Sequence, residues 1–368
     1  MDELLNIRNE IDFIDKKLTE LFEKRMQLVL GVAEYKKKNN LPVLNSKREK
    51  EVIEKNISYL KNKEFAETLE EFFINLMDTS KKLESKKMDV KKNTEIYGLI
   101  GEKLGHSFSP EIHELFLKKS GRGGVYNLFE LPKDKIKEAI EGFKLIKCKG
   151  INVTIPYKTS VMEFLDDISA EAKSIGAVNT LSFKNNKLKG YNTDYIGFGK
   201  MLSKFGVTIE GATCVVLGSG GAAKAVTQYL KDNKCKDLYI VTRTPEKVSE
   251  ALKEFKIINY DELKQIKSGD VIINCTPCGM YPKVDVSPVD EKVVLEFKAA
   301  VDLIYNPLET KFLSYARRND IKSVNGLYML VSQAIAAEEI WNDICVPEKI
   351  VDEIYEALEV KVGAKDEN

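Results

Sequence analysis

Two patterns of hydrophobic residues follow one another along this chain, and the change comes near residue 90. From Leu4 to Tyr35, apolar residues recur at alternating three- and four-residue steps, which is the spacing of one face of a helix. From about Glu95 onward, β-rich runs such as IYGLIG, CVVLG and DVIINC alternate with helical stretches and glycine turns. This alternation is typical of an α/β fold with a mainly parallel sheet. We therefore predict an α + α/β protein, with a helical domain over 1–87, a linker over 88–94 and an α/β region over 95–368.

The helical domain is predicted to contain three helices. The first, of about 35 residues, would be about 50 Å long, which is too long for a domain of this size to cover by itself. Apolar residues at helical spacing predict two further helices, over about 46–61 and 64–83. Because the first helix needs a cover, we expect a homodimer formed through the N-terminal helices.

Composition and charge narrow the classes of function. Lys plus Arg and Asp plus Glu both total 57, so no net positive field attracts nucleic acid or an anionic membrane. The first residues, MDELLNIRNE, resemble no signal segment, and no later apolar run approaches the roughly 20 residues that span a bilayer. Six scattered cysteines suit reduced thiols. We expect a cytoplasmic protein without a metal site, and its two histidines leave most proton transfer to other residue types.

One charged residue interrupts the apolar face of the first helix. Arg25 stands on that face, and Lys36 follows eleven residues later, so three helical turns bring both cations to the same side. A buried cation needs an anionic partner, because an uncompensated charge costs several kcal/mol. By itself this pattern fits either an ion pair that fixes the register of the helices or a site for an anionic ligand.

The surrounding residues favour the ligand site. Over roughly the first 85 residues, Arg8, Arg25, Lys36, Arg48 and Glu49, together with the segment LPVLNSKREKEV, resemble the all-helical chorismate mutase family position by position. The resemblance implies that three helices from each of two chains interlock, and that Arg8 enters the site of the neighbouring chain. It also implies that Arg25 and Lys36 are catalytic. The further substrate contacts that it implies are Arg8, Arg48, Glu49, Ser80 and Glu84.

The reaction of that family explains the choice of residues. Conversion of chorismate to prephenate is a pericyclic rearrangement, so a site has only to hold a flexible dicarboxylate and stabilise charge on the breaking ether oxygen. Arginine forks suit the carboxylates, and Lys36 can donate to the ether oxygen. Many members have Gln where this chain has Glu84, and a Glu donates only when protonated. We therefore predict mutase activity that falls as pH rises.

A glycine-rich turn in the α/β region indicates a dinucleotide. The run GSGGAAKA follows a predicted strand and opens a predicted helix, so Gly218, Gly220 and Gly221 would let the backbone approach a pyrophosphate at the helix N-terminus. Ser219 and Ala222 belong to the same turn. The next strand ends in Thr242, Arg243 and Thr244, with Lys247 beyond, and offers no acid for a ribose 2′-hydroxyl. An arginine there suits a 2′-phosphate, which predicts NADP as the cofactor.

Polar motifs on both sides of this turn suggest the substrate. They are GHSFSPEIHE with Ser107 and Ser109, KGINVTIPYK with Thr154 and Lys158, GAVNT with Asn179, GYNTD with Thr193 and Asp194, NCTPCGM, DLIYNPLET and GLYMLVSQA. Taken alone, either serine reads as a plain helix cap. In this order and spacing, the motifs resemble the shikimate dehydrogenase family across 95–368.

That resemblance implies a role for each motif residue. Lys158 and Asp194 would form the catalytic pair for reduction of 3-dehydroshikimate to shikimate, and the sequence leaves open which of them is the formal proton donor. Substrate contacts would come from Ser107, Ser109, Thr154, Asn179, Thr193, Tyr305 and Gln333. Thr276, Gly326 and Met329 would complete the cofactor site. The family fold has two lobes, so we expect a substrate lobe over 95–195, completed by 326–368, and a Rossmann cofactor lobe over 196–325.

Three functions are compatible with these residues. The first is a bifunctional enzyme that reduces 3-dehydroshikimate and rearranges chorismate. In the second, the helical domain is a dimerising sensor that binds chorismate or prephenate without turning it over. In the third, the α/β region is a quinate/shikimate dehydrogenase that uses NAD, against which Arg243 argues.

Overall fold

The computed structural model describes residues 2–39, 46–87, 94–105, 107–184 and 187–366. Contacts within the chain divide it into two units, residues 1–93 and 94–368, which are described separately below. Except for Thr94, the predicted linker lies outside the described residues. No helix in the described part of the chain is long and apolar enough to cross a membrane.

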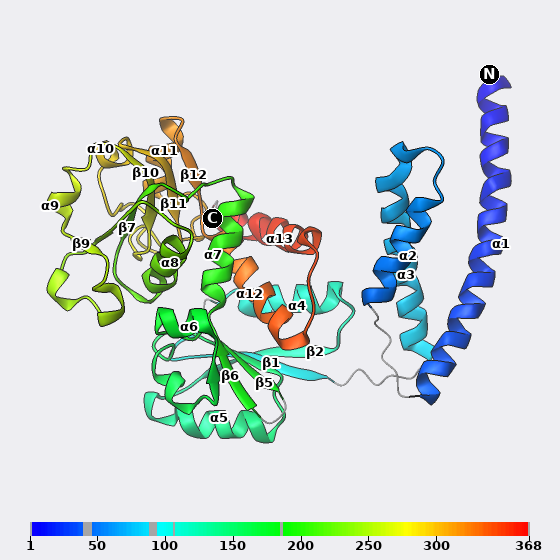
Figure 1. Cartoon of the computed structure of the whole chain (residues 1–368), viewed down its shortest axis with the longest axis horizontal. Helices are drawn as coiled ribbons and strands as arrows, with labels where there is room; N and C mark the ends of the chain where they lie inside the picture. Colours follow the sequence, from blue (N-terminus) through cyan, green and yellow to red (C-terminus); the bar gives the residue numbers. More distant parts are fainter. Residues whose placement is uncertain (1, 40–45, 88–93, 106, 185–186, 367–368) are drawn as a thin grey trace. The chain divides into compact units, whose positions relative to one another are not determined.

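The first unit consists of helices (Figure 1). They are α1 (Asp2–Lys38), α2 (Ser46–Ser58), the short 3-10 helix η1 (Lys63–Phe65) and α3 (Ala66–Lys87). Helix α1 is about 55 Å long, and α3 packs against both α1 and α2. The three predicted helices are therefore present where the apolar spacing placed them.

Little of the apolar face of α1 is covered within one chain. Val29 and Ala33 of α1 and Met77 of α3 are the buried hydrophobic residues among those described in this unit. The large apolar side chains that remain exposed on α1 are Leu4, Leu5, Ile7, Ile11, Phe13, Ile14, Leu18, Leu21, Phe22, Leu28, Val32 and Tyr35. So long an apolar surface on one helix is a feature of interaction sites rather than of free surfaces.

The second unit begins with a mixed sheet of six strands, in the order β2-β1-β3-β5-β6-β4. The strands are β1 (Glu95–Gly101), β2 (Gly124–Glu130), β3 (Gly150–Val153), β4 (Asp167–Ile168), β5 (Thr180–Lys184) and β6 (Lys187–Tyr191). The pairs β1–β2, β1–β3 and β4–β6 are parallel, whereas β5 runs antiparallel to β3 and β6. The helices of this part are α4 (Ser109–Lys119), η2 (Lys133–Lys135), α5 (Ile136–Leu145), η3 (Ser160–Phe164) and α6 (Ala170–Ile175).

A second sheet of six parallel strands follows, in the order β12-β11-β10-β7-β8-β9. The strands are β7 (Thr213–Leu217), β8 (Asp237–Val241), β9 (Lys256–Ile258), β10 (Gly269–Asn274), β11 (Phe297–Asp302) and β12 (Lys322–Val324). The connecting helices are α8 (Gly221–Asp232), η4 (Pro245–Lys247), η5 (Glu250–Leu252), α9 (Tyr260–Leu263), α10 (Glu291–Val294) and α11 (Lys311–Arg318). The strand order changes direction between β7 and β10. In open parallel sheets, ligands bind at such a point, outside the carboxyl ends of the strands.

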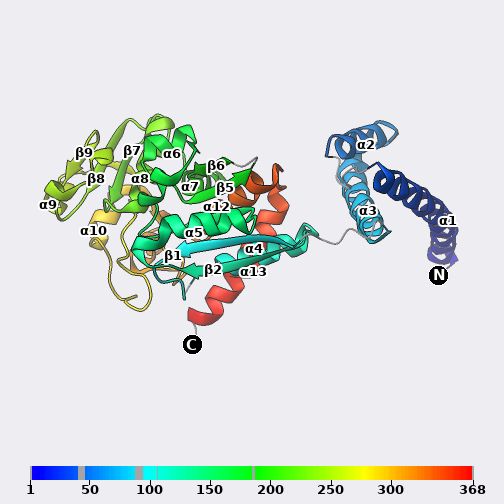
Figure 2. The same ribbon diagram turned by 90° about the horizontal axis from the view of Figure 1, so that it is seen from below.

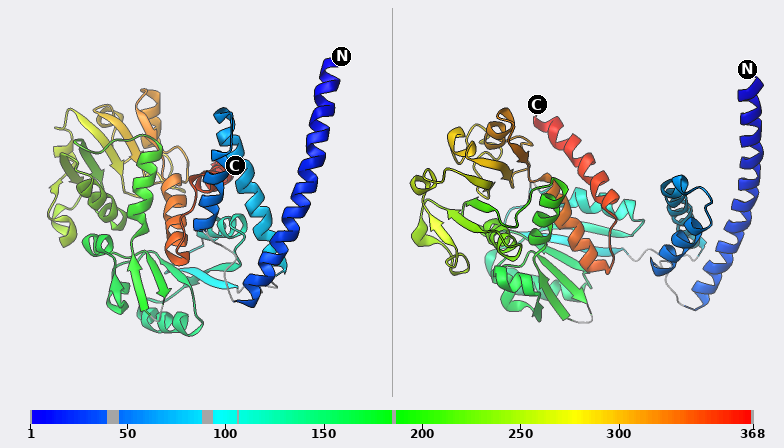
Figure 3. Two further views of the ribbon diagram at one scale, coloured as in Figure 1. Left: turned by 45° about the vertical axis from the view of Figure 1, so that its right-hand side comes forward. Right: turned by 45° about the horizontal axis from the view of Figure 1, so that its top comes forward.

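Three further helices belong to this unit. They are α7 (Thr193–Lys204), α12 (Leu327–Asn342) and α13 (Glu348–Asp366). Helix α12 lies along α7 and also contacts α4, β3 and β5, whereas α13 packs on α4 and α12 (Figures 2 and 3). The last helices of the chain thus cover the sheet that the chain built first.

Trp341 of α12 shows how close this packing is. Its indole N–H donates to the carbonyl of Leu181, 2.9 Å away, and a Cβ added to Gly150 would come within 2.1 Å of its ring. Only a glycine therefore fits on β3 at this point. The helical region followed by two α/β sheets confirms the predicted fold class, and the interlocked dimer stays a prediction.

Candidate active sites

Polar side chains in the first unit gather between α1 and α3. Arg25 donates a hydrogen bond to the hydroxyl of Ser80, and the Lys36 ammonium lies 2.8 Å from a carboxylate oxygen of Glu84. Ser80 and Glu84 are buried, and both cations are largely covered. Burial lowers the pKa of Arg25, and the negative charge of Glu84 opposes that shift. Four of the predicted mutase residues thus share one polar site in a single chain.

The other predicted mutase residues lie apart from this cluster or at its edge. Arg8 is exposed on α1, seventeen residues before Arg25, which is about 25 Å along the helix. Arg48 is largely exposed and lies 3.5 Å from Glu51. Glu49 pairs with Lys81 at 3.2 Å. Within one chain, Arg8 is therefore too distant to act on a ligand held by Arg25.

Lys81 is a charged residue of this unit that the sequence analysis did not select. Burial would lower the pKa of Lys81, but its contacts with Asp78 and Glu49 outweigh burial and raise it. The signal in the sequence is weak, because Lys81 stands in a lysine pair, KK, which commonly marks an exposed face.

In the second unit, a lysine and a carboxylate meet where two elements end. Lys158 follows β3, and Asp194 lies in the first turn of α7. The Lys158 ammonium lies 2.6 Å from Oδ2 of Asp194, and both side chains are mostly buried. The backbone carbonyl of Lys158 accepts a hydrogen bond of 2.7 Å from the N–H of Val178, which anchors the lysine at its base.

Asn179 holds the carboxylate from behind. Its Nδ2 donates to Oδ1 of Asp194 at 2.9 Å, so the two carboxylate oxygens have different partners. Its Oδ1 accepts from the N–H of Thr193 at 2.7 Å and from the hydroxyl of Thr193 at 3.1 Å. Both residues are buried. The side chains of Asn179 and Thr193 are thus engaged within the protein in this structure.

The remaining predicted substrate contacts come from four different segments. Ser107 and Ser109 stand at the start of α4, where the Ser107 hydroxyl accepts from the N–H of Ser109 at 3.2 Å. Tyr305 follows β11, and its ring packs edge-on against Phe108 at 6.0 Å between centroids. Gln333 lies on α12 close to Gly197 of α7, where an added Cβ would come within 2.9 Å of its own Cβ. Thr154 directly follows β3.

The glycine turn after β7 has the geometry that a pyrophosphate needs. Gly218 has a φ of +98°, and an added Cβ would come within 2.8 Å of the Cγ2 of Thr276. At Gly220 and Gly221, by contrast, an added Cβ would meet nothing within 4 Å. Helix α8 starts at Gly221 without a side-chain cap, so its first N–H groups are open to an anion.

The first residues after β8, Thr242 to Thr244, include one cation and no acid, and the exposed Glu246 follows in η4. Thr242 is buried at the end of the strand and accepts a hydrogen bond of 3.4 Å from Ser219, whereas Arg243, Thr244 and Lys247 are exposed. Burial raises the pKa of Tyr260, and the charge of Arg243 opposes that shift, which places the arginine near this ring. This side of the turn is suited to a phosphate-bearing ribose rather than to a free 2′-hydroxyl.

Gly326 and Met329 belong to the start of α12. Gly326 caps that helix, and an added Cβ would come within 2.1 Å of the Leu303 carbonyl oxygen. The backbone carbonyl of Met329 faces Gly197, and the side chain of Met329 is buried. Met329 therefore has limited room for direct contact with a cofactor.

A buried carboxylate that the sequence analysis did not select supports Thr276. Asp302, at the end of β11, accepts hydrogen bonds from Asn274 at 2.9 Å and from Thr310 at 2.7 Å. Asn274 in turn accepts from the N–H and the hydroxyl of Thr276, at 3.0 and 2.7 Å. The motif NCTPCGM contains two of these residues, but the partner Asp302 is 28 positions further along the chain. No cluster able to hold a metal ion occurs among the residues that the structure describes.

Comparison with known proteins identifies the second unit. Residues 99–181 match the family model for the shikimate dehydrogenase substrate binding domain, and residues 199–283 match the model for shikimate / quinate 5-dehydrogenase. Shikimate dehydrogenase (NADP(+)) of Clostridium perfringens is 52% identical over 268 residues, which are 72% of this chain and 99% of that protein. The chain belongs to the shikimate dehydrogenase family.

Two solved structures extend this assignment. A chorismate mutase/shikimate 5-dehydrogenase fusion protein from Clostridium acetobutylicum is 65% identical, with a TM-score of 0.71 over 74% of this chain and 99% of that chain. A shikimate 5-dehydrogenase from Thermus thermophilus, solved with NADP(H) and shikimate, is 29% identical, with a TM-score of 0.66 over 72% of this chain and 99% of that chain.

The first unit has a match of its own. Residues 7–85 match the family model for chorismate mutase type II. The chain is therefore a fusion of a chorismate mutase type II domain with shikimate dehydrogenase domains, and the predicted family resemblance is confirmed for both parts.

Proposed function

We propose that this protein is a bifunctional enzyme that reduces 3-dehydroshikimate to shikimate with NADPH and rearranges chorismate to prephenate. The observation that carries the first activity is the pair of Lys158 and Asp194, 2.6 Å apart and flanked by Asn179. Reduction of a ring carbonyl needs a positioned acid, and histidine is scarce in this chain. The lysine–aspartate pair fills that need.

The two charges have different tasks. The Lys158 ammonium delivers the proton to the carbonyl oxygen, and Asp194 keeps the ammonium in one place. Asn179 fixes the carboxylate through its other oxygen. Ser107 and Ser109 at the start of α4 bind the substrate carboxylate, and Thr154, Asn179, Thr193, Tyr305 and Gln333 bound the rest of the substrate site.

The turn after β7 and the end of β8 hold NADP. When bound, NADPH supplies the hydride for the reduction. Open space beside Gly220 and Gly221 admits the pyrophosphate, and Arg243, with Thr244 and Lys247 beside it, binds the 2′-phosphate. Ser219, Ala222, Thr242, Thr276 and Gly326 line the same site, and the buried Met329 supports it from α12. Directly after β8 stand Thr242 and Arg243 rather than an acid, which disfavours NAD, and with it an NAD-dependent quinate dehydrogenase.

The helical unit supplies the second activity. Arg25 and Lys36 face the same site between α1 and α3, and they hold an anionic substrate and donate to its ether oxygen. Arg8 is about 25 Å from Arg25 along α1, so it acts in the site of a second copy, and the exposed apolar face of α1 is covered there. Arg48, Glu49, Ser80 and Glu84 complete the site in this homodimer.

The cell compartment also follows as a proposal. All six cysteines are free, and one of them, Cys345, is exposed. Unpaired thiols are characteristic of the reducing cytoplasm. We therefore place the enzyme there.

The test is a pair of separate variants of the full chain. Lys158→Ala should abolish shikimate oxidation with NADP and leave chorismate turnover intact, whereas Arg25→Ala should do the opposite. Loss of both activities in either variant would contradict independent sites. If the unmodified chain turns over no chorismate but chorismate changes its dehydrogenase rate, the helical unit is a sensor instead.

A further inference from the structure

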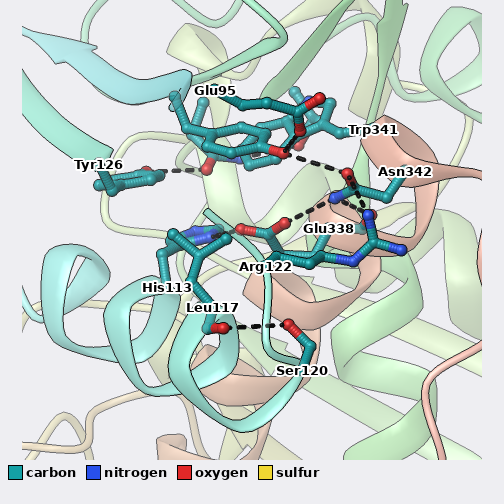
Figure 4. A network of polar contacts seen from close by, with 12 residues as sticks. Glu95, His113, Leu117, Ser120, Arg122, Tyr126, Glu338, Trp341 and Asn342 are labelled. Atoms are coloured by element: carbon teal, nitrogen blue, oxygen red, sulfur yellow. Dashed lines mark hydrogen bonds and ion pairs between the residues drawn. The ribbon is translucent and has the colours of Figure 1, made fainter. Parts of the chain in front are cut away.

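A second buried network lies behind the dehydrogenase site, and Tyr126 of β2 connects the two. Its ring is stacked on the ring of His113, with 4.0 Å between centroids and 8° between planes (Figure 4). His113 is itself held by Glu338 of α12, with Nδ1 2.6 Å from Oε1. His113 and Glu338 are almost fully buried. The Tyr126 ring thus rests on a support that joins α4 to α12.

The hydroxyl of Tyr126 has one proton to give. It donates to Oδ1 of Asn152 at 2.8 Å. Burial raises the pKa of Tyr126 well above its ordinary value, and the neighbouring Ser109 hydroxyl opposes that shift only in part. The phenol therefore stays protonated at any working pH and remains a donor to Asn152.

This donation fixes which way the Asn152 amide faces. Because Oδ1 is taken by Tyr126, Nδ2 turns the other way and donates to the Thr180 hydroxyl at 3.0 Å and to the Asn179 carbonyl at 3.3 Å. With Asn152 as its donor, Thr180 is free to give its own proton to Oδ1 of Asn179, 3.0 Å away. Asn179 then presents its Nδ2 to Asp194. Oδ1 of Asn179 also accepts from the N–H and the hydroxyl of Thr193, so Thr180 is one of three donors that hold this amide in place.

We propose that Tyr126 is a positioning residue of the dehydrogenase: its hydroxyl orients Asn152, and through Thr180 and Asn179 it holds Asp194 against Lys158. This inference rests on the proposed role of Lys158 and Asp194. Without the hydroxyl, Oδ1 of Asn152 loses its donor, and the amide is held only through Nδ2, by the Asn179 carbonyl and the Thr180 hydroxyl. The Thr180 hydroxyl that Asn152 positions is then held less firmly against Asn179, and Asp194 loses part of its fixed orientation.

The experiment compares two tyrosine-to-phenylalanine changes in the full chain. Tyr126→Phe keeps the ring stacked on His113 and removes only the hydroxyl. Tyr97→Phe is the matched control, because Tyr97 is also a buried ring, stacked on Trp341 at 5.1 Å. Its hydroxyl donates to Glu95 and lies 3.1 Å from Oδ1 of Asn342, rather than pointing toward Asp194. Shikimate oxidation, thermal melting and the pH dependence of kcat are measured for both.

Tyr126→Phe should lower kcat about tenfold, with KM for shikimate changed less than about twofold, and it should alter the pH profile of kcat. Tyr97→Phe should keep kcat within about twofold and the pH profile of kcat unchanged. This should hold even if its melting temperature falls by as much as that of Tyr126→Phe. Equal kcat values in Tyr126→Phe and the unmodified enzyme would overturn the proposal. So would equal losses in both variants, because they would mark a general structural effect.

A double-mutant cycle tests the route through Asn152. Asn152→Ala should lower kcat at least as much as Tyr126→Phe, and adding Tyr126→Phe to it should cost little more. Additive losses would overturn the route. Lys158→Ala separates this inference from the proposed function. If Lys158→Ala is inactive while Tyr126→Phe has normal kcat, only the positioning role of Tyr126 fails. If Lys158→Ala is active, the proposed catalytic role of Lys158 and Asp194 fails as well.

Discussion

Replacement of Asp302 by asparagine should change how the stability of the second unit depends on pH. Asp302 is fully buried, and it accepts hydrogen bonds from Asn274, Thr310 and the N–H of Ile304. Burial raises the pKa of Asp302 from 3.8 to about 7, against the opposing effect of the three donors. Asparagine has nearly the same shape as the protonated acid but does not titrate.

The sign follows from proton binding. Between about pH 4 and 7, the folded protein keeps a proton on Asp302 that the unfolded chain has released, so the folded form binds more protons and its stability falls as pH rises. This contribution is fully present below about pH 4 and is lost above about pH 7. Each pKa unit corresponds to about 1.4 kcal/mol, so the whole difference of about 3 units amounts to about 4 kcal/mol.

The assay is urea unfolding at several pH values from 4.5 to 7.5, followed by tryptophan fluorescence. Trp341 is the single tryptophan of the chain and is buried in the second unit, so it reports that unit alone. As pH rises, the unfolding free energy of the unmodified protein should fall relative to that of Asp302→Asn. The difference should grow by about 1 kcal/mol or more per pH unit.

Asp270→Asn provides the control for this measurement. The ammonium of Lys298 and the N–H of Thr213 lower the pKa of Asp270, so this carboxylate stays ionised across the same interval. The unfolding free energy of Asp270→Asn should therefore change with pH in the same way as that of the unmodified protein. Parallel curves for Asp302→Asn would refute the reasoning, because they would mean that the three donors keep Asp302 ionised when buried.

Three other changes test the two sites. Arg243→Ala should raise KM for NADPH about tenfold or more and leave KM for NADH nearly unchanged in steady-state kinetics, and an equal rise for both would contradict the 2′-phosphate contact. Gly218→Ala should lower the melting temperature, because an alanine costs about 1–2 kcal/mol at φ +98° and its Cβ would also meet Thr276. Gly220→Ala should keep the melting temperature but bind NADPH weakly, because its Cβ would fill open space beside the turn. Glu84→Gln removes the carboxylate that pairs with Lys36 and should change chorismate turnover at a fixed pH, and an unchanged rate would remove Glu84 from the site.

The sequence predicted best what depends on neighbouring residues. The helices of the first unit follow from apolar spacing over a few turns, and the turn at Gly218 follows from glycines between a strand and a helix. Ser107 and Ser109 illustrate the limit of such local patterns, because either serine alone suggests a helix cap, yet Phe108 occupies the cap position of α4 and makes no side-chain cap.

The supporting residues could not be predicted in the same way, because their partners are distant in the sequence. His113 pairs with Glu338, which lies 225 residues later, and Tyr126 donates to Asn152, which lies 26 residues later. Asp302 stood within a matched motif, but nothing local indicates that it is buried. Such residues become visible only when the fold brings their elements together.

The return of α12 to the first sheet has a consequence for synthesis on the ribosome. Strands β1 to β6 end at Tyr191, but the indole that covers Gly150 belongs to residue 341 and emerges about 150 codons later. At roughly 5–20 residues per second, the nascent sheet waits about 8 to 30 seconds with that surface bare. A nonsense mutation between codons 192 and 341 would leave this surface of the first sheet without its indole.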